Sequence, residues 1–120
     1  MTTFSKQFLS ASTDGAAIKV VATDSTGTTI HATGISASII DEVWLYAYNS
    51  HSTTVELTLQ YGGITSPNND IKITLDSKAG LTLLVPGLIL KGTGSVATTV
   101  YAYAATANVI TLSGYVNRIS

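Results

Sequence analysis

Apolar and polar residues alternate along most of the chain, and the apolar positions are rich in β-branched and aromatic side chains. A period of two is typical of strands with one buried face, and no stretch shows the period of 3.6 expected of an amphipathic helix. The alternation predicts strands at 17–22, 28–33, 43–48, 55–61, 71–75, 81–85, 88–91, 96–104 and 109–119. This pattern predicts an all-β fold, an antiparallel β-sandwich or jelly roll of about 8 strands.

Residues that favour turns separate the apolar segments. Examples are 23–27 (TDSTG), 62–70 (GGITSPNND) and 92–95 (GTGS). Gly, Asn, Asp and Ser adopt turn conformations at low cost, so these clusters are expected to be loops. Pro86 and Gly87 stand between two apolar runs. Because proline cannot donate a hydrogen bond to a central ladder, we expect a bend or a change of sheet there.

The length of 120 residues is that of one domain. We expect a single β-sandwich domain over residues 16–120. Residues 1–15 are polar apart from a few possible anchors, chiefly Phe4, Phe8 and Leu9. They predict an N-terminal arm that becomes ordered on assembly, or a flexible end that frays.

Two stretches of the chain resemble each other at a distance of 55 residues. WLYAYNSHSTTVELTLQYGG begins at Trp44 and TVYAYAATANVITLSGYVNR begins at Thr99, and the shift aligns 45–48 with 100–103 without a gap. Each copy has an aromatic strand, a polar connection and a returning strand with alternating apolar positions, which predicts two β-hairpins. The similarity reflects either an internal duplication or the independent use of the same strand pattern in two parts of the chain.

Strand parity separates aromatic from aliphatic residues within each copy. In 43–48 the odd positions are Val, Leu and Ala, and the even positions are aromatic. If the aliphatic residues fill the core, the aromatic ones lie on the outer surface, where rings with one polar tip are good interface anchors. The alternative is that the rings themselves form the core. The candidate interface residues are Trp44, Tyr46, Tyr48, Tyr101 and Tyr103.

Charged residues make up 11% of the chain, against about 25% in ordinary soluble domains, and 19 Thr and 13 Ser supply polarity instead. A surface poor in charge repels its neighbours weakly, which favours packing between proteins; a monomer wetted by hydroxyl groups is the alternative. The net charge is −1 and the basic residues are scattered, so no nucleic-acid partner is expected. No run is apolar enough for a membrane helix, and without cysteine there is no disulfide or thiolate site.

Few ionisable groups are available for catalysis, which requires several that converge. His31 and His51 lie in separate segments and lack further ligands at metal-binding spacing. Asp41 and Glu42 would point to opposite faces of a strand, so they do not form an acid–base pair. The sequence NND at 68–70 favours a turn over a calcium loop. We therefore expect no enzyme, no cofactor and no metal site.

Three stretches resemble a family of small virion-structural proteins from tailed bacteriophages. They are 44–61 (WLYAYNSHSTTVELTLQY), 81–90 (LTLLVPGLIL) and 100–119 (VYAYAATANVITLSGYVNRI). The resemblance spans residues 40–119 and consists of hydrophobic strand patterns rather than catalytic motifs. It implies a capsid decoration or cement protein, a β-sandwich that assembles as a small symmetric oligomer on the phage head.

We therefore expect a structural virion protein that binds the major capsid protein or other virion proteins, and that associates with its own copies. By analogy with the threefold positions of capsids, the expected homo-oligomer is a trimer. Such a protein is made in the host cytoplasm and located on the virion, most simply on the head surface. The alternative is a tail or fibre sandwich in which the row of Trp44, Tyr46 and Tyr48 stacks on host-surface carbohydrate.

Overall fold

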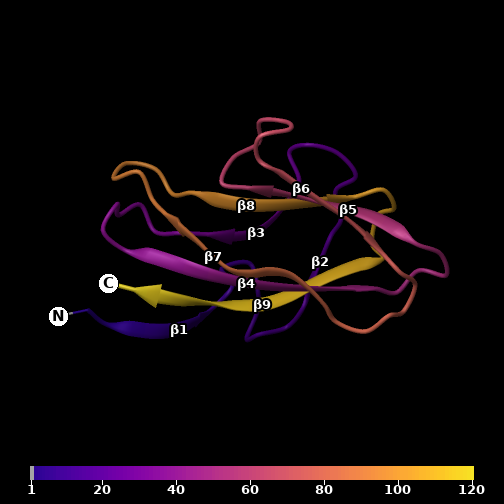
Figure 1. Ribbon diagram of the computed structural model, residues 1–120, viewed down its shortest axis with the longest axis horizontal. Coiled ribbons are helices and arrows are strands. Elements are labelled where there is room, and N and C mark those ends of the chain that lie inside the picture. Colours follow the sequence, from indigo (N-terminus) through magenta and orange to yellow (C-terminus); the bar gives the residue numbers. More distant parts are fainter. Residues whose placement is uncertain (1) are drawn as a thin grey trace.

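The computed structural model describes residues 2–120, which form two antiparallel β-sheets packed face to face (Figure 1). This described range contains nine strands and no helix, so the predicted all-β antiparallel sandwich is confirmed, while a jelly-roll topology stays a prediction. The strands are β1 (Phe4–Phe8), β2 (Ile18–Lys19), β3 (Thr28–Ala32), β4 (Ile40–Asn49), β5 (Val55–Tyr61), β6 (Asp70–Leu75), β7 (Thr82–Lys91), β8 (Thr99–Ala104) and β9 (Ile110–Ile119).

The strands divide into a five-stranded sheet, here sheet A, and a four-stranded sheet, here sheet B. Sheet A has the order β1-β9-β4-β7, and the short strand β2 also pairs with β9. Sheet B has the order β3-β8-β5-β6 and lies above sheet A in Figure 1. Thr3 and Ser120 exchange two backbone hydrogen bonds of 2.8 and 2.9 Å, so the start of the described chain is tied to its end.

Aliphatic side chains from the two inward faces meet between the sheets. In β4 every second residue, from Asp41 to Asn49, is buried. The central core side chains are Val43, Leu45, Ala47, Leu57, Leu59, Val100, Ala102, Ile110 and Leu112. Each buried Leu, Val or Ile contributes about 1.5–3 kcal/mol relative to an exposed one. The aliphatic half of the alternation therefore forms the core, and the aromatic half of β4 lies outside it.

The two predicted hairpins are wrong. β4 lies in sheet A and β5 in sheet B, while β8 lies in sheet B and β9 in sheet A. Each copy of the repeat is therefore an arch, whose connection crosses from one sheet to the other. The strands pair between the copies instead, because β4 pairs with β9 and β5 pairs with β8.

The repeat of 55 residues is nevertheless visible in the arches. A shift of 55 residues aligns the end of β4, Asn49, with the end of β8, Ala104. It also aligns the start of β5, Val55, with the start of β9, Ile110. Each strand has one aliphatic face, and the two strands of an arch bury those faces against each other from opposite sheets. The alternation that resembled a hairpin is therefore the pattern of an arch.

The expected interruption at Pro86 and Gly87 is a β-bulge within one strand, not a change of sheet, and a second bulge lies at Leu84. The segments predicted at 81–85 and 88–91 join in β7, whose register with β4 shifts between Val43 and Trp44 and again between Leu45 and Tyr46. β7 is the edge strand of sheet A, where a missing backbone donor is tolerated.

Most of the expected N-terminal arm is bound to the sandwich. Residues 4–8 form β1, which pairs with β9 over its whole length, and Leu9 is fully buried. The expectation of a free arm is therefore corrected for these residues, while Met1 lies outside the described residues. The reason is that β9 extends past β2 and leaves an edge, which β1 completes.

We predict that Gly114→Ala destabilises the sandwich. Gly114 lies opposite Leu45 in the β4–β9 ladder with a φ of 153°, and a Cβ there would overlap the carbonyl oxygen of Trp44. The ladder must shift to admit the methyl group, which we expect to lower the free energy of unfolding by about 2–3 kcal/mol.

The control is Gly34→Ala, because no atom lies within 4 Å of a Cβ placed at Gly34. We expect this change to alter the free energy of unfolding by less than about 0.5 kcal/mol. Urea unfolding followed by circular dichroism measures both variants. Equal stabilities for the two would contradict the close pairing of β4 with β9.

Candidate functional site

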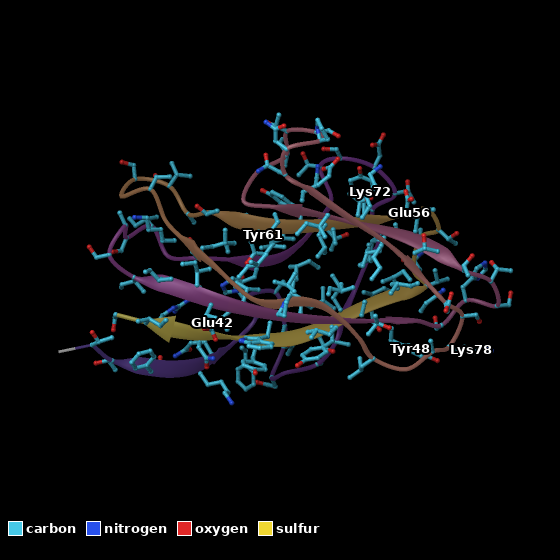
Figure 2. The ribbon with its side chains drawn as sticks, viewed as in Figure 1. Glu42, Tyr48, Glu56, Tyr61, Lys72 and Lys78 are labelled. Atoms are coloured by element: carbon cyan, nitrogen blue, oxygen red, sulfur yellow. The ribbon has the colours of Figure 1, made fainter. Side chains whose placement is uncertain are left out.

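The five candidate interface residues lie on the outer faces of both sheets. Trp44, Tyr46 and Tyr48 are half-buried on the outer face of sheet A, whereas Tyr101 and Tyr103 are half-buried on that of sheet B. Figure 2 labels Tyr48 and Glu42 on the sheet A side, and Glu56 and Lys72 on the sheet B side. The structure therefore separates the predicted set into two groups, which do not form one continuous surface.

The outer face of sheet A is broad and apolar. The register places its side chains in rows across the strands, for example Phe8, Tyr115, Trp44 and Pro86 in one row. Exposed apolar side chains lie along both edges of the face: Phe4 (71% exposed) and Phe8 (63%) from β1, and Leu83 (45%) and Ile89 (60%) from β7. Large exposed apolar patches are typical of surfaces that bind another protein.

Trp44 is held rigidly at the centre of this face. Its ring stacks on Tyr115 with a centroid separation of 6.2 Å and an interplanar angle of 11°. The indole also lies against Gly87 of the edge strand, where a Cβ would come within 3.1 Å of the ring. The Lys6 ammonium lies 4.8 Å from the centroid of the Tyr115 ring. A rigid aromatic anchor loses little conformational entropy on binding.

The polar atoms around Trp44 are already paired with one another. The indole Nε1 donates to Glu42 Oε1 at 2.9 Å, and Asn117 Nδ2 donates to the same oxygen at 3.0 Å. These two hydrogen bonds lower the pKa of Glu42 below its usual value. A partner that covers this face therefore finds these polar groups already hydrogen-bonded, which reduces the cost of removing water from them.

A shallow hollow of about 510 Å³ opens beside the aromatic stack. It is lined by Lys6, Gln7, Phe8, Gly15, Gly114 and Tyr115. The hollow is a depression in the outer face between β1 and β9, so it belongs to the same surface.

The outer face of sheet B is more polar and partly covered. Thr58 and Gln60 of β5 point to this side but are buried. The loop at 23–27 lies over Gln60, because Gly27 N donates to Gln60 Oε1 at 3.1 Å and Gln60 Nε2 donates to Ser25 Oγ at 2.7 Å. The bare apolar surface of the sandwich is therefore that of sheet A.

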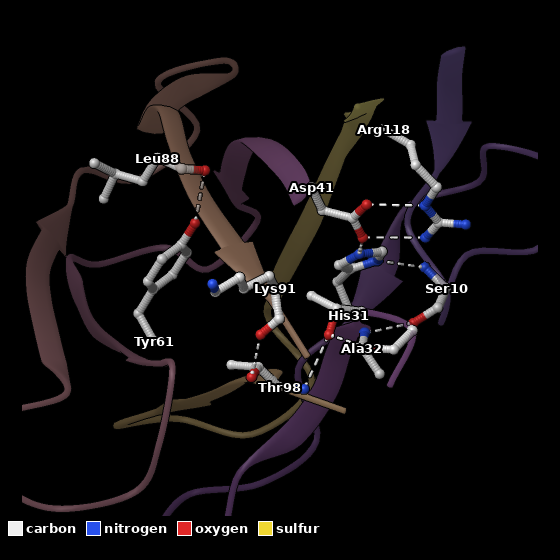
Figure 3. A network of polar contacts seen from close by, with 11 residues as sticks. Ser10, His31, Ala32, Asp41, Tyr61, Leu88, Lys91, Thr98 and Arg118 are labelled. Carbon is white, nitrogen blue, oxygen red and sulfur yellow. Dashed lines mark hydrogen bonds and ion pairs between the residues drawn. The ribbon is translucent and has the colours of Figure 1, made fainter. Parts of the chain in front are cut away.

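A buried polar network connects the two sheets at the end of the core where β9 ends (Figure 3). His31 comes from β3 in sheet B and Asp41 from β4 in sheet A, and each is 1% exposed. His31 Nε2 lies 2.8 Å from Asp41 Oδ2. Arg118 binds the same carboxylate through Nε at 2.9 Å and Nη2 at 3.1 Å. Ser10 N donates to His31 Nδ1 at 3.0 Å.

A β-bulge brings His31 into the core. The register of β3 with β8 shifts between Thr29 and His31, so Ile30 and His31 are both buried although they are neighbours. The alternation along the sequence does not indicate this bulge, which places His31 in the core beside Ile30. Asp41 and Glu42 do point to opposite faces, as strand parity predicts.

The network holds Asp41 in its ionised form. Burial raises the pKa of Asp41, but the hydrogen bonds and charges of Arg118 and His31 lower it further, so the net shift is downward. The bond to Asp41 likewise raises the pKa of Arg118. The carboxylate is enclosed and paired, so the arrangement connects the sheets rather than presenting an open catalytic group.

The remaining polar candidates serve the local fold. Asn69 Oδ1 accepts from Thr65 N at 3.1 Å, and Asn69 Nδ2 donates to Tyr61 O at 3.3 Å, so the side chain closes the turn after β5. His51 lies in the connection of the first arch, away from His31. Within residues 2–120, no group of three or more His, Cys, Asp or Glu side chains is placed to hold a metal ion. The same residues include no helix long and apolar enough to cross a membrane.

Comparison with protein-family models, with curated proteins and with solved structures gives no match to this chain. The function is therefore inferred from the residues and their geometry.

We predict that Asp41→Asn lowers stability in a pH-dependent way. The folded-state pKa of Asp41 lies below its ordinary value of 3.8, so the ionised carboxylate stabilises the fold above that pH, and this stabilisation is lost as the pH falls through the folded pKa. Removing one partner of a buried ion pair costs about 3–5 kcal/mol, which we expect in urea unfolding at pH 7.

As the pH falls below 3.8 and through the folded pKa of Asp41, wild type loses the contribution of the carboxylate, and the difference from the variant should shrink. Asp76→Asn, at an exposed position, is the control and should change stability by less than about 0.5 kcal/mol. A stability difference for Asp41→Asn that stays constant from pH 7 to low pH would show that the carboxylate does not carry this effect.

Proposed function

We propose that the protein is a structural virion component, a decoration or cement protein that docks on the capsid shell of a tailed bacteriophage through the outer face of sheet A. The observation that carries the proposal is this bare apolar face, with the rigid stack of Trp44 on Tyr115 at its centre. The phage-like strand patterns in residues 40–119 supply the setting.

The size of the face supports docking on another protein. β4, β7 and β9 have ten residues each and β1 has five. At about 3.3 Å per residue and about 4.8 Å between strands, their flat projected area is on the order of 550 Å² before the side chains are counted. A stable protein interface buries about 800 Å² on each partner, so this face, together with its projecting side chains, is of the required size. Aromatic residues at its centre are the type that contributes most binding energy.

The low charge also supports assembly. On the outer face of sheet A, the charged side chains are Lys6, Lys19, Glu42 and Lys91, and the Glu42 carboxylate is already hydrogen-bonded. Copies can therefore crowd together on a lattice with little mutual repulsion. A shell offers many equivalent sites, and a small homo-oligomer, for which we propose a trimer, multiplies moderate contacts by avidity.

A second function, carbohydrate binding by a tail or fibre module, has one observation in its favour. The indole of Trp44 lies against Gly87 and stacks on Tyr115, which lines the hollow, and an aromatic platform of this kind suits the apolar face of a sugar ring. A glycan array on the purified protein separates the two functions. A decoration protein should bind no glycan through Trp44, whereas a carbohydrate-binding module should.

We predict that Ile89→Glu abolishes docking without unfolding the protein. Ile89 is exposed on the outer face of sheet A, so a carboxylate there does not disturb the core but must be desolvated in an interface. The expected loss of affinity for capsids that lack the protein is at least tenfold in co-sedimentation.

The matched control is Thr29→Glu, an exposed strand position in sheet B. It adds the same charge to the opposite side of the sandwich and should leave co-sedimentation unchanged. Light scattering after size exclusion reports the oligomer of each variant. Equal binding by both variants, or a wild-type protein that is strictly monomeric and does not bind capsids, would remove the proposal.

A further inference from the structure

The hydrogen bonds of His31 fix which of its nitrogens carries the proton. Ser10 N is a backbone donor and points at His31 Nδ1 from 3.0 Å, so Nδ1 must provide a lone pair. The proton of the neutral ring then sits on Nε2, which donates to Asp41 Oδ2 at 2.8 Å. The ring thus accepts from the N-terminal segment on one side and donates to sheet A on the other (Figure 3).

A second proton on His31 is incompatible with this arrangement. The imidazolium has no lone pair on Nδ1, so two N–H groups would face each other where Ser10 N now donates. The bond from Nε2 to Asp41 survives protonation, because the carboxylate accepts from either form. The conflict therefore falls on the contact with Ser10 alone.

The charges around His31 are known from each element that packs against it. β4 brings the Asp41 carboxylate and β9 brings the Arg118 guanidinium, which already neutralise each other. The strand β8, which pairs with β3, has no charged residue. The segment from Phe8 to Thr13 has none either, and His31 is the one titratable residue of β3. A proton on His31 would add a positive charge beside a carboxylate that Arg118 already binds, and the new N–H on Nδ1 would face the Ser10 N–H.

Apart from His31, the N-terminal segment is held by its ladder with β9, by the Thr3–Ser120 backbone pair and by contacts at residues 9–11. Four of the five residues of β1 are exposed, so its ladder with β9 opens to water along the edge of sheet A. Behind it, Leu9 is buried, Ala32 N donates to Ser10 Oγ at 2.7 Å, and Ala11 N donates to Ile30 O at 3.3 Å. The buried part of the attachment is thus at residues 9–11, against β3, whereas the ladder of β1 with β9 is exposed.

We propose that His31 is an acid-sensitive latch that holds β1 in sheet A, and that protonation of His31 releases residues 4–11. Release removes Phe4, Lys6 and Phe8 from the outer face of sheet A, since all three belong to β1. The latch is inferred from the contacts of His31 alone. Its consequence for docking, that acid weakens binding to the capsid, rests on the function proposed above.

Hydrogen exchange of the backbone amides at residues 5–11 tests the latch on the purified full chain. Protection factors, which remove the intrinsic pH dependence of exchange, are measured between about pH 7 and 5, where histidine changes charge. Because opening is coupled to the uptake of one proton, the opening equilibrium constant should rise by up to about tenfold per pH unit. Residues of the β4–β9 ladder should keep their protection over the same range.

Two variants distinguish the latch from a general effect of acid. His31→Gln does not titrate in this range and should make the protection of residues 5–11 independent of pH. His51→Gln is the matched control, because the contacts of His51 involve its backbone atoms, and it should retain the wild-type pH dependence. A pH-independent wild type, or a His31→Gln variant that keeps the dependence, overturns the latch.

If His31→Gln does not fold, nitrogen NMR of the histidine rings in the wild-type protein provides a second test of the latch. The spectrum should show a proton on Nε2 of His31 and none on Nδ1 at pH 7, and His31 should gain its second proton over the pH range in which residues 5–11 lose protection. A proton on Nδ1 at pH 7 overturns the proposal. Protection that does not change with pH would contradict the latch but not the proposed docking. A failure to bind capsids would contradict the docking but not the latch.

Discussion

The continuous ladder between β4 and β9 is the constraint on which the rest of the structure depends. It pairs ten residues of each strand in one register, from Ile40 opposite Ile119 to Asn49 opposite Ile110. Since side chains alternate between the two faces of a strand, this register decides which residues fill the core and which form the outer face. A shift of β4 by one residue would turn Trp44 into the core and Leu45 to the outer face. Neither the core nor the outer face of sheet A would then form.

Polar groups at both ends of β4 secure this register. The inward row of β4 begins with Asp41 and ends with Asn49, and aliphatic residues lie between them. Asp41 is paired with His31 and Arg118, and Asn49 Nδ2 donates to the carbonyl oxygens of Thr53 and Leu75, each at 3.0 Å. Buried polar groups are tolerated where their partners are in place, so a shifted strand would leave both ends unsatisfied.

Further contacts join the sheets away from β4. The Tyr61 hydroxyl, from β5 in sheet B, donates to Leu88 O in β7 of sheet A at 3.0 Å, and burial raises the pKa of this phenol (Figure 3). Thr98 Oγ1 donates to Lys91 O at 2.6 Å. The edge strand that carries Ile89 and Leu83 is thus fixed to both sheets, which keeps the outer face of sheet A rigid. Rigidity of this kind favours the proposed docking, because a rigid surface loses little conformational entropy on binding.

Local alternation was enough to predict most of the strands and the orientation of Trp44 against Leu45. It did not identify strand partners, because the connection of residues 50–54 is compatible with both a hairpin and an arch, and the choice depends on how distant strands fill one core. The position of His31 was missed because a bulge changes the parity of β3, and a bulge depends on its partner strand. The attachment of β1 was missed for a similar reason, since its residues are mostly exposed and its partner is the last strand of the chain.

The central claim is that the outer face of sheet A is covered in the assembled state. The chain contains no cysteine, so a single introduced thiol reports one position. Ser113→Cys lies on this face beside Tyr46, and Thr29→Cys lies on a strand of sheet B. Labelling with a water-soluble maleimide, free and on capsids, should show at least tenfold protection of Cys at position 113 and none at position 29. Equal labelling of both positions on the capsid would contradict the claim.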